Sequence, residues 1–188
     1  MDFEHVLKAL VDAFGRHEIR YAAIGGFAMG ALGAGRMTRD LDFLVDRDDM
    51  PRLHEALTQL GYERSASTEN VSHYRHADGR WVGIDVLHAF RALARDMITR
   101  AAPHPIFRNT ASVAIAAPED VIALKVQAIA NNPHRRLQDQ ADIERLMELY
   151  RDRLDWDQVQ RYYELFDLGE EGRELRRRFG DVQRRSDT

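Results

Sequence analysis

The segment from Thr38 to Val45 constrains the fold most, because it carries two carboxylates two residues apart and ends in the apolar run Phe43-Leu44-Val45. The apolar run predicts a β-strand, and successive side chains of a strand point to opposite faces. Asp40 and Asp42 project to the polar side, and the same period adds Arg36 and Thr38. A polar face of this length on a core strand is expected to line a site.

Asp40 and Asp42 would repel each other on one strand face unless a cation lay between them. Carboxylates are hard oxygen ligands suited to Mg²⁺ or Mn²⁺, and such ions are usually shared with substrate phosphates. The pair therefore predicts half of a metal site. The alternative is an edge strand whose two acids are simply solvated.

Gly25 and Gly26 end the apolar run that begins at Arg20. Glycine lets backbone N–H groups approach an anion, and a helix that begins there adds its dipole. This predicts a cradle for phosphates. An ordinary strand-to-helix turn would use the same residues.

Asp85 lies in Val82-Gly83-Ile84-Asp85-Val86-Leu87, where apolar residues flank it closely. A buried unpaired carboxylate is costly, so Asp85 should have a cation or hydrogen-bond donors. If this strand lies beside residues 38–45, Asp85 completes a cluster of three carboxylates. That cluster could bind two metals, or one metal beside a general base. The alternative is a strand-end acid that caps a turn.

Lys125 falls in the apolar stripe of a predicted helix, one turn from Val121 and one from Ile129. It either extends to solvent or reaches an acidic or phosphate partner, and we favour the partner. Asp139 and Asp142 share a face of the next predicted helix, near its buried side. Their simpler interpretation is that they offset the helix dipole.

Composition excludes several other chemistries. The chain has no cysteine, which excludes thiolate metal sites and a Cys nucleophile. Its histidines form no zinc motif, since His73 and His76 lack same-face spacing. The net charge of −4 argues against a general nucleic-acid binder. The first residues do not resemble a signal peptide, and no apolar run approaches the roughly 18 residues needed to span a membrane, so we expect a cytoplasmic protein.

Hydrophobic periodicity divides the 188 residues into a mixed part over 1–116 and a helical part over 117–188. We therefore expect an α+β fold, a mixed sheet flanked by helices, followed by a C-terminal helical bundle packed on that core. Strands are expected at 20–24, 38–45, 74–76, 81–87 and 106–115, with the last broken near Asn109. Helices are expected at 2–16, 27–32, 50–60, 91–101, 118–131, 136–151, 155–166 and 169–180.

The run Ile24-Gly25-Gly26-Phe27-Ala28, Gly33, Gly35, Arg36, Thr38, Asp40-Leu41-Asp42-Phe43, with Asp85 as a late third carboxylate, resembles the nucleotidyltransferase superfamily with the polymerase-beta-like fold. Within it the chain looks most like the AbiEii/AbiGii-type toxin nucleotidyltransferases, because Lys125 and Asp139-Gln140-Ala141-Asp142 match their helix lysine and Asp-x-x-Asp. It is also similar to lincosamide and aminoglycoside nucleotidyltransferases.

The resemblance implies a role for each candidate residue. Asp40 and Asp42 would hold Mg²⁺ on the β- and γ-phosphates of an NTP, and Asp85 would share a metal and activate the acceptor hydroxyl. The triphosphate would be bound by residues from several segments: Gly25, Gly26, Arg36, Thr38, Lys125 and Asp142. Attack on the α-phosphorus would release pyrophosphate, with Lys125 offsetting charge in the transition state.

Three functional hypotheses follow from the resemblance. The first is a Mg²⁺-dependent nucleotidyltransferase that modifies RNA, such as a tRNA acceptor end, in a toxin–antitoxin setting with an antitoxin protein as partner. The second modifies a hydroxyl of a small molecule, an aminoglycoside or lincosamide antibiotic. The third is an inactive member that only binds nucleotides.

Overall fold

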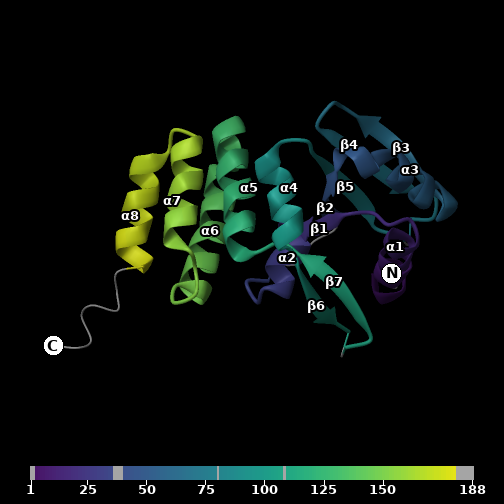
Figure 1. The fold of residues 1–188 in the computed structure, drawn as a ribbon, viewed down its shortest axis with the longest axis horizontal. Coiled ribbons are helices and arrows are strands. Elements are labelled where there is room, and N and C mark those ends of the chain that lie inside the picture. The colour runs from purple at the N-terminus through teal and green to yellow at the C-terminus, as the bar shows by residue number, and fades with distance from the viewer. Residues whose placement is uncertain (1–2, 36–39, 80, 108, 181–188) are drawn as a thin grey trace. The chain divides into compact units, whose positions relative to one another are not determined.

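The computed structural model describes residues 3–35, 40–79, 81–107 and 109–180. The chain divides into two compact units, whose elements are labelled in Figure 1. The core unit comprises Met1–Ala31 and Gly35–Ala117, and the helical unit comprises Leu32–Ala34 and Pro118–Thr188. Arg36 and Thr38, both predicted to bind nucleotide, lie outside the described residues.

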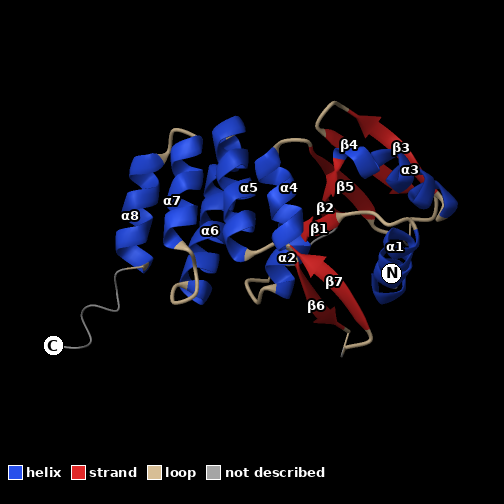
Figure 2. Ribbon diagram, in the orientation of Figure 1, coloured by secondary structure: helices blue, strands red, loops and turns tan. Residues whose placement is uncertain are grey.

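The core unit contains helices and strands, whereas the described part of the helical unit contains helices alone (Figure 2). The core elements are α1 Phe3–Arg16, β1 Tyr21–Ile24, α2 Gly25–Ala31, β2 Asp40–Asp46, α3 Met50–Gln59, β3 Tyr62–Ser67, β4 Val71–His76, β5 Gly83–Ala89, α4 Ala92–Arg100, β6 Ala102–Ile106 and β7 Ala111–Ile115. The long helices of the second unit are α5 Pro118–Asn131, α6 Arg136–Tyr150, α7 Trp156–Leu165 and α8 Gly169–Phe179.

The described strands form a seven-stranded sheet in the order β3-β4-β5-β2-β1-β7-β6. The β2–β5 and β1–β7 pairs are parallel, and the other pairs are antiparallel. The sheet is therefore mixed, as expected, and β2 is its central strand. A central strand has neighbours on both sides, which excludes the interpretation of Asp40 and Asp42 as solvated acids on an edge.

Aromatic packing fixes which face of β2 is covered. The Phe43 ring contacts Phe14 of α1 and Tyr21 of β1, with ring centroids 5.3 and 5.7 Å apart. Phe43 and Leu41 are fully buried, whereas Asp40 and Asp42 are half-buried. Because successive side chains of a strand point to opposite faces, this packing directs the two acids to the other side of the sheet.

A buried acid joins the start of β1 to the start of α3. Asp49 is 1% exposed and accepts hydrogen bonds from the Arg20 backbone N–H at 2.9 Å and the Arg20 Nε at 2.9 Å. Its other oxygen accepts from Arg20 Nη2 at 3.1 Å and is also paired with Arg52. Asp49 occupies the N-cap position of α3, but its side chain bonds these arginines instead of the helix backbone.

The strand predicted over 106–115 is confirmed only in its second half, which forms β7, and the expected break near Asn109 coincides with a φ of +68° at that residue. Strand β6 mostly precedes the predicted range and pairs antiparallel with β7. The sheet also contains β3, which was not predicted. The strands predicted at 74–76 and 81–87 correspond to β4 and β5, which pair antiparallel. No helix within the described ranges is long and apolar enough to cross a membrane.

Candidate active site

The central strand and its parallel neighbour bring three predicted acids together. In the β2–β5 register Asp42 lies opposite Asp85, and Asp40 lies opposite Gly83. Paired strands are about 4.8 Å apart, so the Asp42 and Asp85 side chains leave the same sheet face as neighbours. The Asp85 strand therefore lies beside the strand carrying Asp40 and Asp42, which is the condition that the sequence set for a cluster of three carboxylates.

Two glycines provide the space that the β2 carboxylates occupy. Gly25 follows β1 directly, has a φ of +62°, and a Cβ there would overlap Asp42 Oδ2 and lie 2.6 Å from Asp42 Cγ. A Cβ at Gly83 would likewise overlap Asp40 Oδ1. Real Cβ atoms do not approach neighbours so closely. A larger residue at either position would therefore displace the carboxylate beside it.

Strand β4 supplies two cationic or donor side chains that sequence reasoning did not assign to the site. His73 Nδ1 lies 2.8 Å from Asp85 Oδ1, and Arg75 Nη1 donates to the same oxygen at 3.1 Å. His73 lies opposite Asp85 in the β4–β5 register. Sequence reasoning missed His73 because the predicted strand began only at residue 74, whereas β4 begins at Val71 and places Val71, His73 and Arg75 on one face.

The donor set fits a divalent cation at Asp40 and Asp42. Both carboxylates are hard oxygen ligands, both are partly exposed, and each sits over a glycine that leaves room for it. In the described part of the chain, no three histidine or acidic side chains are grouped to hold a metal ion. Asp85 instead bonds His73 and Arg75, so the three-carboxylate metal set stays a prediction.

Lys125 belongs to a buried ion cluster in the helical unit. Its Nζ donates to Asp139 Oδ1 at 3.1 Å and to Asp142 Oδ2 at 2.6 Å, and Lys125 is only 7% exposed. Arg135 Nε donates to the other Asp139 oxygen at 3.0 Å. Burial favours a higher pKa for Asp139, but the bond from Arg135 and the charge of Lys125 lower it below its ordinary value. The expectation that Lys125 reaches an acidic partner is confirmed.

The family of the chain follows from its sequence over most of this length. Residues 3–170 match the family described as uncharacterised nucleotidyltransferases. The chain belongs to this family. It is therefore a nucleotidyltransferase, an enzyme of the transferase class. No curated protein matches the chain.

Solved structures with similar folds agree with this nucleotidyltransferase assignment. The antibiotic-resistance factor ANT(2″)-Ia is 17% identical, with a TM-score of 0.64 over 95% of this chain and 99% of that one. The lincosamide antibiotic adenylyltransferase LnuA is 14% identical, with a TM-score of 0.56 over 78% and 97%. An antigenic nucleotidyltransferase-like protein from Paracoccidioides brasiliensis is 18% identical, with a TM-score of 0.56 over 90% and 88%. At these identities the likeness shows the fold.

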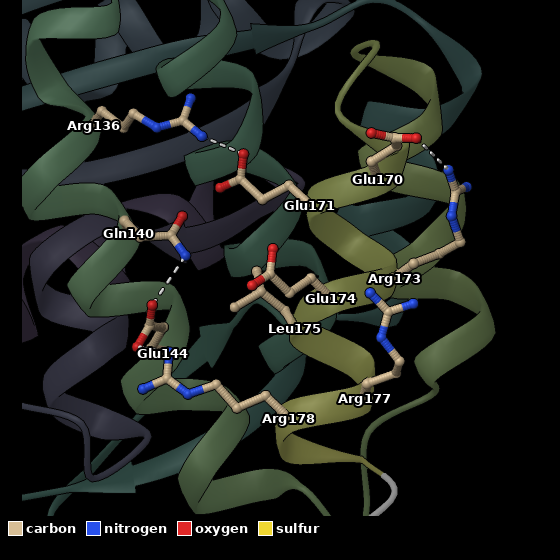
Figure 3. Close-up of a pocket in the computed structure, with 10 residues that line it drawn as sticks. All are labelled: Arg136, Gln140, Glu144, Glu170, Glu171, Arg173, Glu174, Leu175, Arg177 and Arg178. Atoms are coloured by element: carbon tan, nitrogen blue, oxygen red, sulfur yellow. Dashed lines mark hydrogen bonds and ion pairs between the residues drawn. The ribbon is translucent and has the colours of Figure 1, made fainter.

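The nucleotidyltransferase also has a cavity of about 640 Å³ between α6 and α8 of its helical unit (Figure 3). Four arginines and four glutamates line it. Four of these eight charged residues are paired across the cavity: Arg136 with Glu171, and Arg178 Nη1 with Glu144 Oε2 at 3.0 Å. The arginines and glutamates of the lining balance in charge, and no group of metal ligands is found there among the described residues.

Proposed function

We propose that the chain transfers a nucleoside monophosphate from an NTP to an acceptor hydroxyl, using a divalent cation held by Asp40 and Asp42. The observation that carries the proposal is the β2–β5 pairing, which sets Asp85 beside this acid pair on one sheet face. Membership of the nucleotidyltransferase family supports it independently.

Each residue of the core site has a chemical task in this proposal. Asp40 and Asp42 would hold Mg²⁺ or Mn²⁺, which when bound neutralises charge on the triphosphate. Gly25 leaves room for the Asp42 carboxylate, and the Gly25 and Gly26 backbone N–H groups would face phosphate oxygens. Asp85 would take the proton of the acceptor hydroxyl while the hydroxyl oxygen bonds the α-phosphorus. The bond from that phosphorus to the β-phosphate breaks, and pyrophosphate leaves with the electron pair.

Phosphate contacts by Arg36, Thr38, Lys125 and Asp142 stay predictions. Arg36 and Thr38 lie outside the described residues. The charge of Lys125 is already balanced by its acidic partners in the helical unit. That balance supports a structural role for Lys125 at least as well as a catalytic one.

For the acceptor we propose a small hydroxylated molecule of the aminoglycoside or lincosamide type. This rests on the likeness to ANT(2″)-Ia over 95% of this chain and on the charges of α8. Three of its arginines have acidic partners: Arg176 with Asp157 at 2.6 Å, Arg178 with Glu144, and Arg173 with Glu164. Paired arginines do not form the free basic surface that RNA binding requires.

RNA remains the alternative acceptor, because Lys125 and the Asp139–Asp142 pair resemble those of toxin nucleotidyltransferases. In that case tRNA would be the substrate, and an antitoxin protein would be the partner. An inactive nucleotide-binding member is a further alternative, although all three predicted carboxylates are present.

A labelling experiment tests the function and separates the acceptors. The protein is incubated with each α-³²P-labelled NTP, Mg²⁺ and either tobramycin, lincomycin or total tRNA. We expect label in one of the small molecules and none with EDTA. Label in tRNA alone would support the alternative. Label in no acceptor, while nucleotide still binds, would indicate the inactive member.

The variant Asp42→Ala tests the metal assignment. We expect it to reduce label transfer by at least a thousandfold, because one of the two carboxylates of the ion site is removed. The matched control is Asp48→Ala, whose carboxylate is exposed and lies just beyond the end of β2. Activity that survives in Asp42→Ala at the level of the control would show that the cation is held elsewhere.

A further inference from the structure

The Asp85 carboxylate is bound asymmetrically by the core unit. Both donors from β4 contact the same oxygen: His73 Nδ1 at 2.8 Å and Arg75 Nη1 at 3.1 Å from Oδ1. None of the residues that the structure describes hydrogen-bonds the second oxygen, Oδ2. The carboxylate is thus held on one side and open on the other, while its side chain is 24% exposed.

The strand that carries these donors is itself firmly placed. Tyr74, between them in sequence, is fully buried on the opposite face, and Ser72 is 1% exposed. The Ser72 hydroxyl lies 3.0 Å from His88 Nε2 on β5. Because β4 is secured to β5 on both sides of His73, the imidazole has a defined position relative to Asp85.

His73 and Arg75 differ in how well they can orient a carboxylate. Histidine has two side-chain torsions and reaches Asp85 from the position directly opposite it. Arginine is longer, and half of the Arg75 side chain is exposed, so more rotamer freedom is lost when it is held. The shorter contact and stiffer side chain make His73 the better candidate for fixing the carboxylate.

We propose that His73 is a positioning residue for nucleotidyl transfer. Its Nδ1–H donates to Asp85 Oδ1 and turns the carboxylate so that Oδ2 meets the acceptor hydroxyl. This inference rests on the proposed function. In the step it serves, the acceptor O–H bond breaks and its proton goes to Oδ2. The freed oxygen bonds the α-phosphorus, and pyrophosphate leaves with the electrons of the broken P–O bond.

It follows that the three carboxylates have different roles. Asp40 and Asp42 face the cation and the triphosphate, whereas Asp85 is oriented by protein donors. Changes at His73 should therefore affect the rate of the chemical step and leave the binding of the metal–nucleotide complex intact. A substitution at a residue with a merely structural role would not lower the rate of the chemical step while leaving nucleotide binding intact.

The kinetic test compares His73→Leu with His73→Asn. Leucine removes the donor, whereas the asparagine amide nitrogen takes nearly the place of Nδ1 and keeps it. With the acceptor that is labelled by the wild-type chain, we expect His73→Leu to lower kcat at least tenfold. The KM for NTP and the calorimetric Kd for Mg·ATP should change less than twofold. His73→Asn should restore kcat to within threefold of wild type.

Other kinetic outcomes would contradict the positioning role. Wild-type kcat in His73→Leu would show that the contact does not matter, and equal losses in both variants would show that the donor is not the relevant group. A weakened Kd for Mg·ATP in His73→Leu would place His73 in nucleotide binding instead. A wild-type chain that labels no acceptor overturns the proposed function, which is a different failure.

A measurement on the wild-type chain tests the contact even if a variant fails to fold. Long-range ¹H–¹⁵N correlation spectra of the imidazole rings report which ring nitrogen carries the proton. We expect a proton on Nδ1 of His73, and a changed Nδ1 resonance in Asp85→Asn. An Nδ1 without a proton in the folded wild-type chain would overturn the proposal, because Nδ1 could not donate to Asp85.

Discussion

At the scale of single residues, the candidate site depends on the absence of a side chain at Gly25. Its φ of +62° and its approach to the Asp42 carboxylate both require glycine. Alanine there would add about 1–2 kcal/mol of backbone strain and would push the carboxylate out of place. We expect Gly25→Ala to weaken Mg·ATP binding at least tenfold, as measured by calorimetry.

Gly30 is the matched control for this substitution. It lies in the same helix, α2, but a Cβ there would meet no atom within 4 Å. We expect Gly30→Ala to bind Mg·ATP normally and to gain about 0.5–1 kcal/mol of stability from its better helix propensity. If the two variants bound Mg·ATP equally well, the Asp42 carboxylate would not need the space that Gly25 provides.

Some of these residues could be predicted from sequence and others could not. Alternation over a few residues identified Asp40 and Asp42, and helical spacing showed that Lys125 needed a partner. The contact of His73 with Asp85 was missed because it depends on the register of the β4–β5 pair, which local periodicity does not determine. The need of Asp85 for donors was predicted, but not which residues supply them.

At the scale of elements, a buried ion cluster joins α5 to α6. Lys125 on α5 is paired with Asp139 and Asp142 on α6, and all three are at most 9% exposed. Removing one member leaves buried charges without their partner, which typically costs about 3–5 kcal/mol. We expect Lys125→Met to lower the free energy of unfolding by about 3 kcal/mol in urea titrations.

Lys8 offers the matched control, because it and Lys125 are the only lysines in the sequence. Its ion pair with Glu4 on α1 is exposed, and pairs of this kind contribute little. Lys8→Met should therefore change stability by less than about 0.5 kcal/mol. If the two variants lost similar amounts of stability, the contribution of the Lys125 cluster would not come from its burial.

Elements with weak local patterns were the ones that sequence analysis missed. Every residue of β3 after Tyr62 is exposed, so this edge strand has no alternation of buried and polar positions. Strand β6 contains Pro103 and Pro105. Proline is compatible only with an edge strand, so propensity does not predict a strand at these residues. The central strands β2 and β5 were predicted because their apolar residues recur with a clear period, and the structure buries these residues.

At the scale of the whole molecule, acid stability of the core depends on Asp49. Burial favours a higher pKa, but the bonds from Arg20 and Arg52 outweigh it and lower the pKa from 3.8 to about 2. The folded chain therefore holds this proton less tightly than the unfolded chain does. The resulting stabilisation is complete above about pH 4 and is lost as the pH falls toward 2.

The shift corresponds to about 2 kcal/mol at neutral pH, from roughly 1.4 kcal/mol per pKa unit. We expect Asp49→Asn to lower the free energy of unfolding by this amount at pH 7 and by less than about 1 kcal/mol at pH 2.5. Asp48→Asn, at an exposed neighbour, should have little effect at either pH. A loss in Asp49→Asn that did not shrink in acid would argue against the charge as its cause.

The parallel pairing of β2 with β5 has a consequence for how the enzyme folds. Between these neighbours the chain forms α3, β3 and β4, so Asp42 and Asp85 meet only after a long loop has closed. Contacts between residues distant in sequence form late, because their closure entropy must be offset first. A chain in which this loop has not closed thus carries Asp40 and Asp42 without Asp85 beside them, so the candidate site is complete only once β2 and β5 have paired.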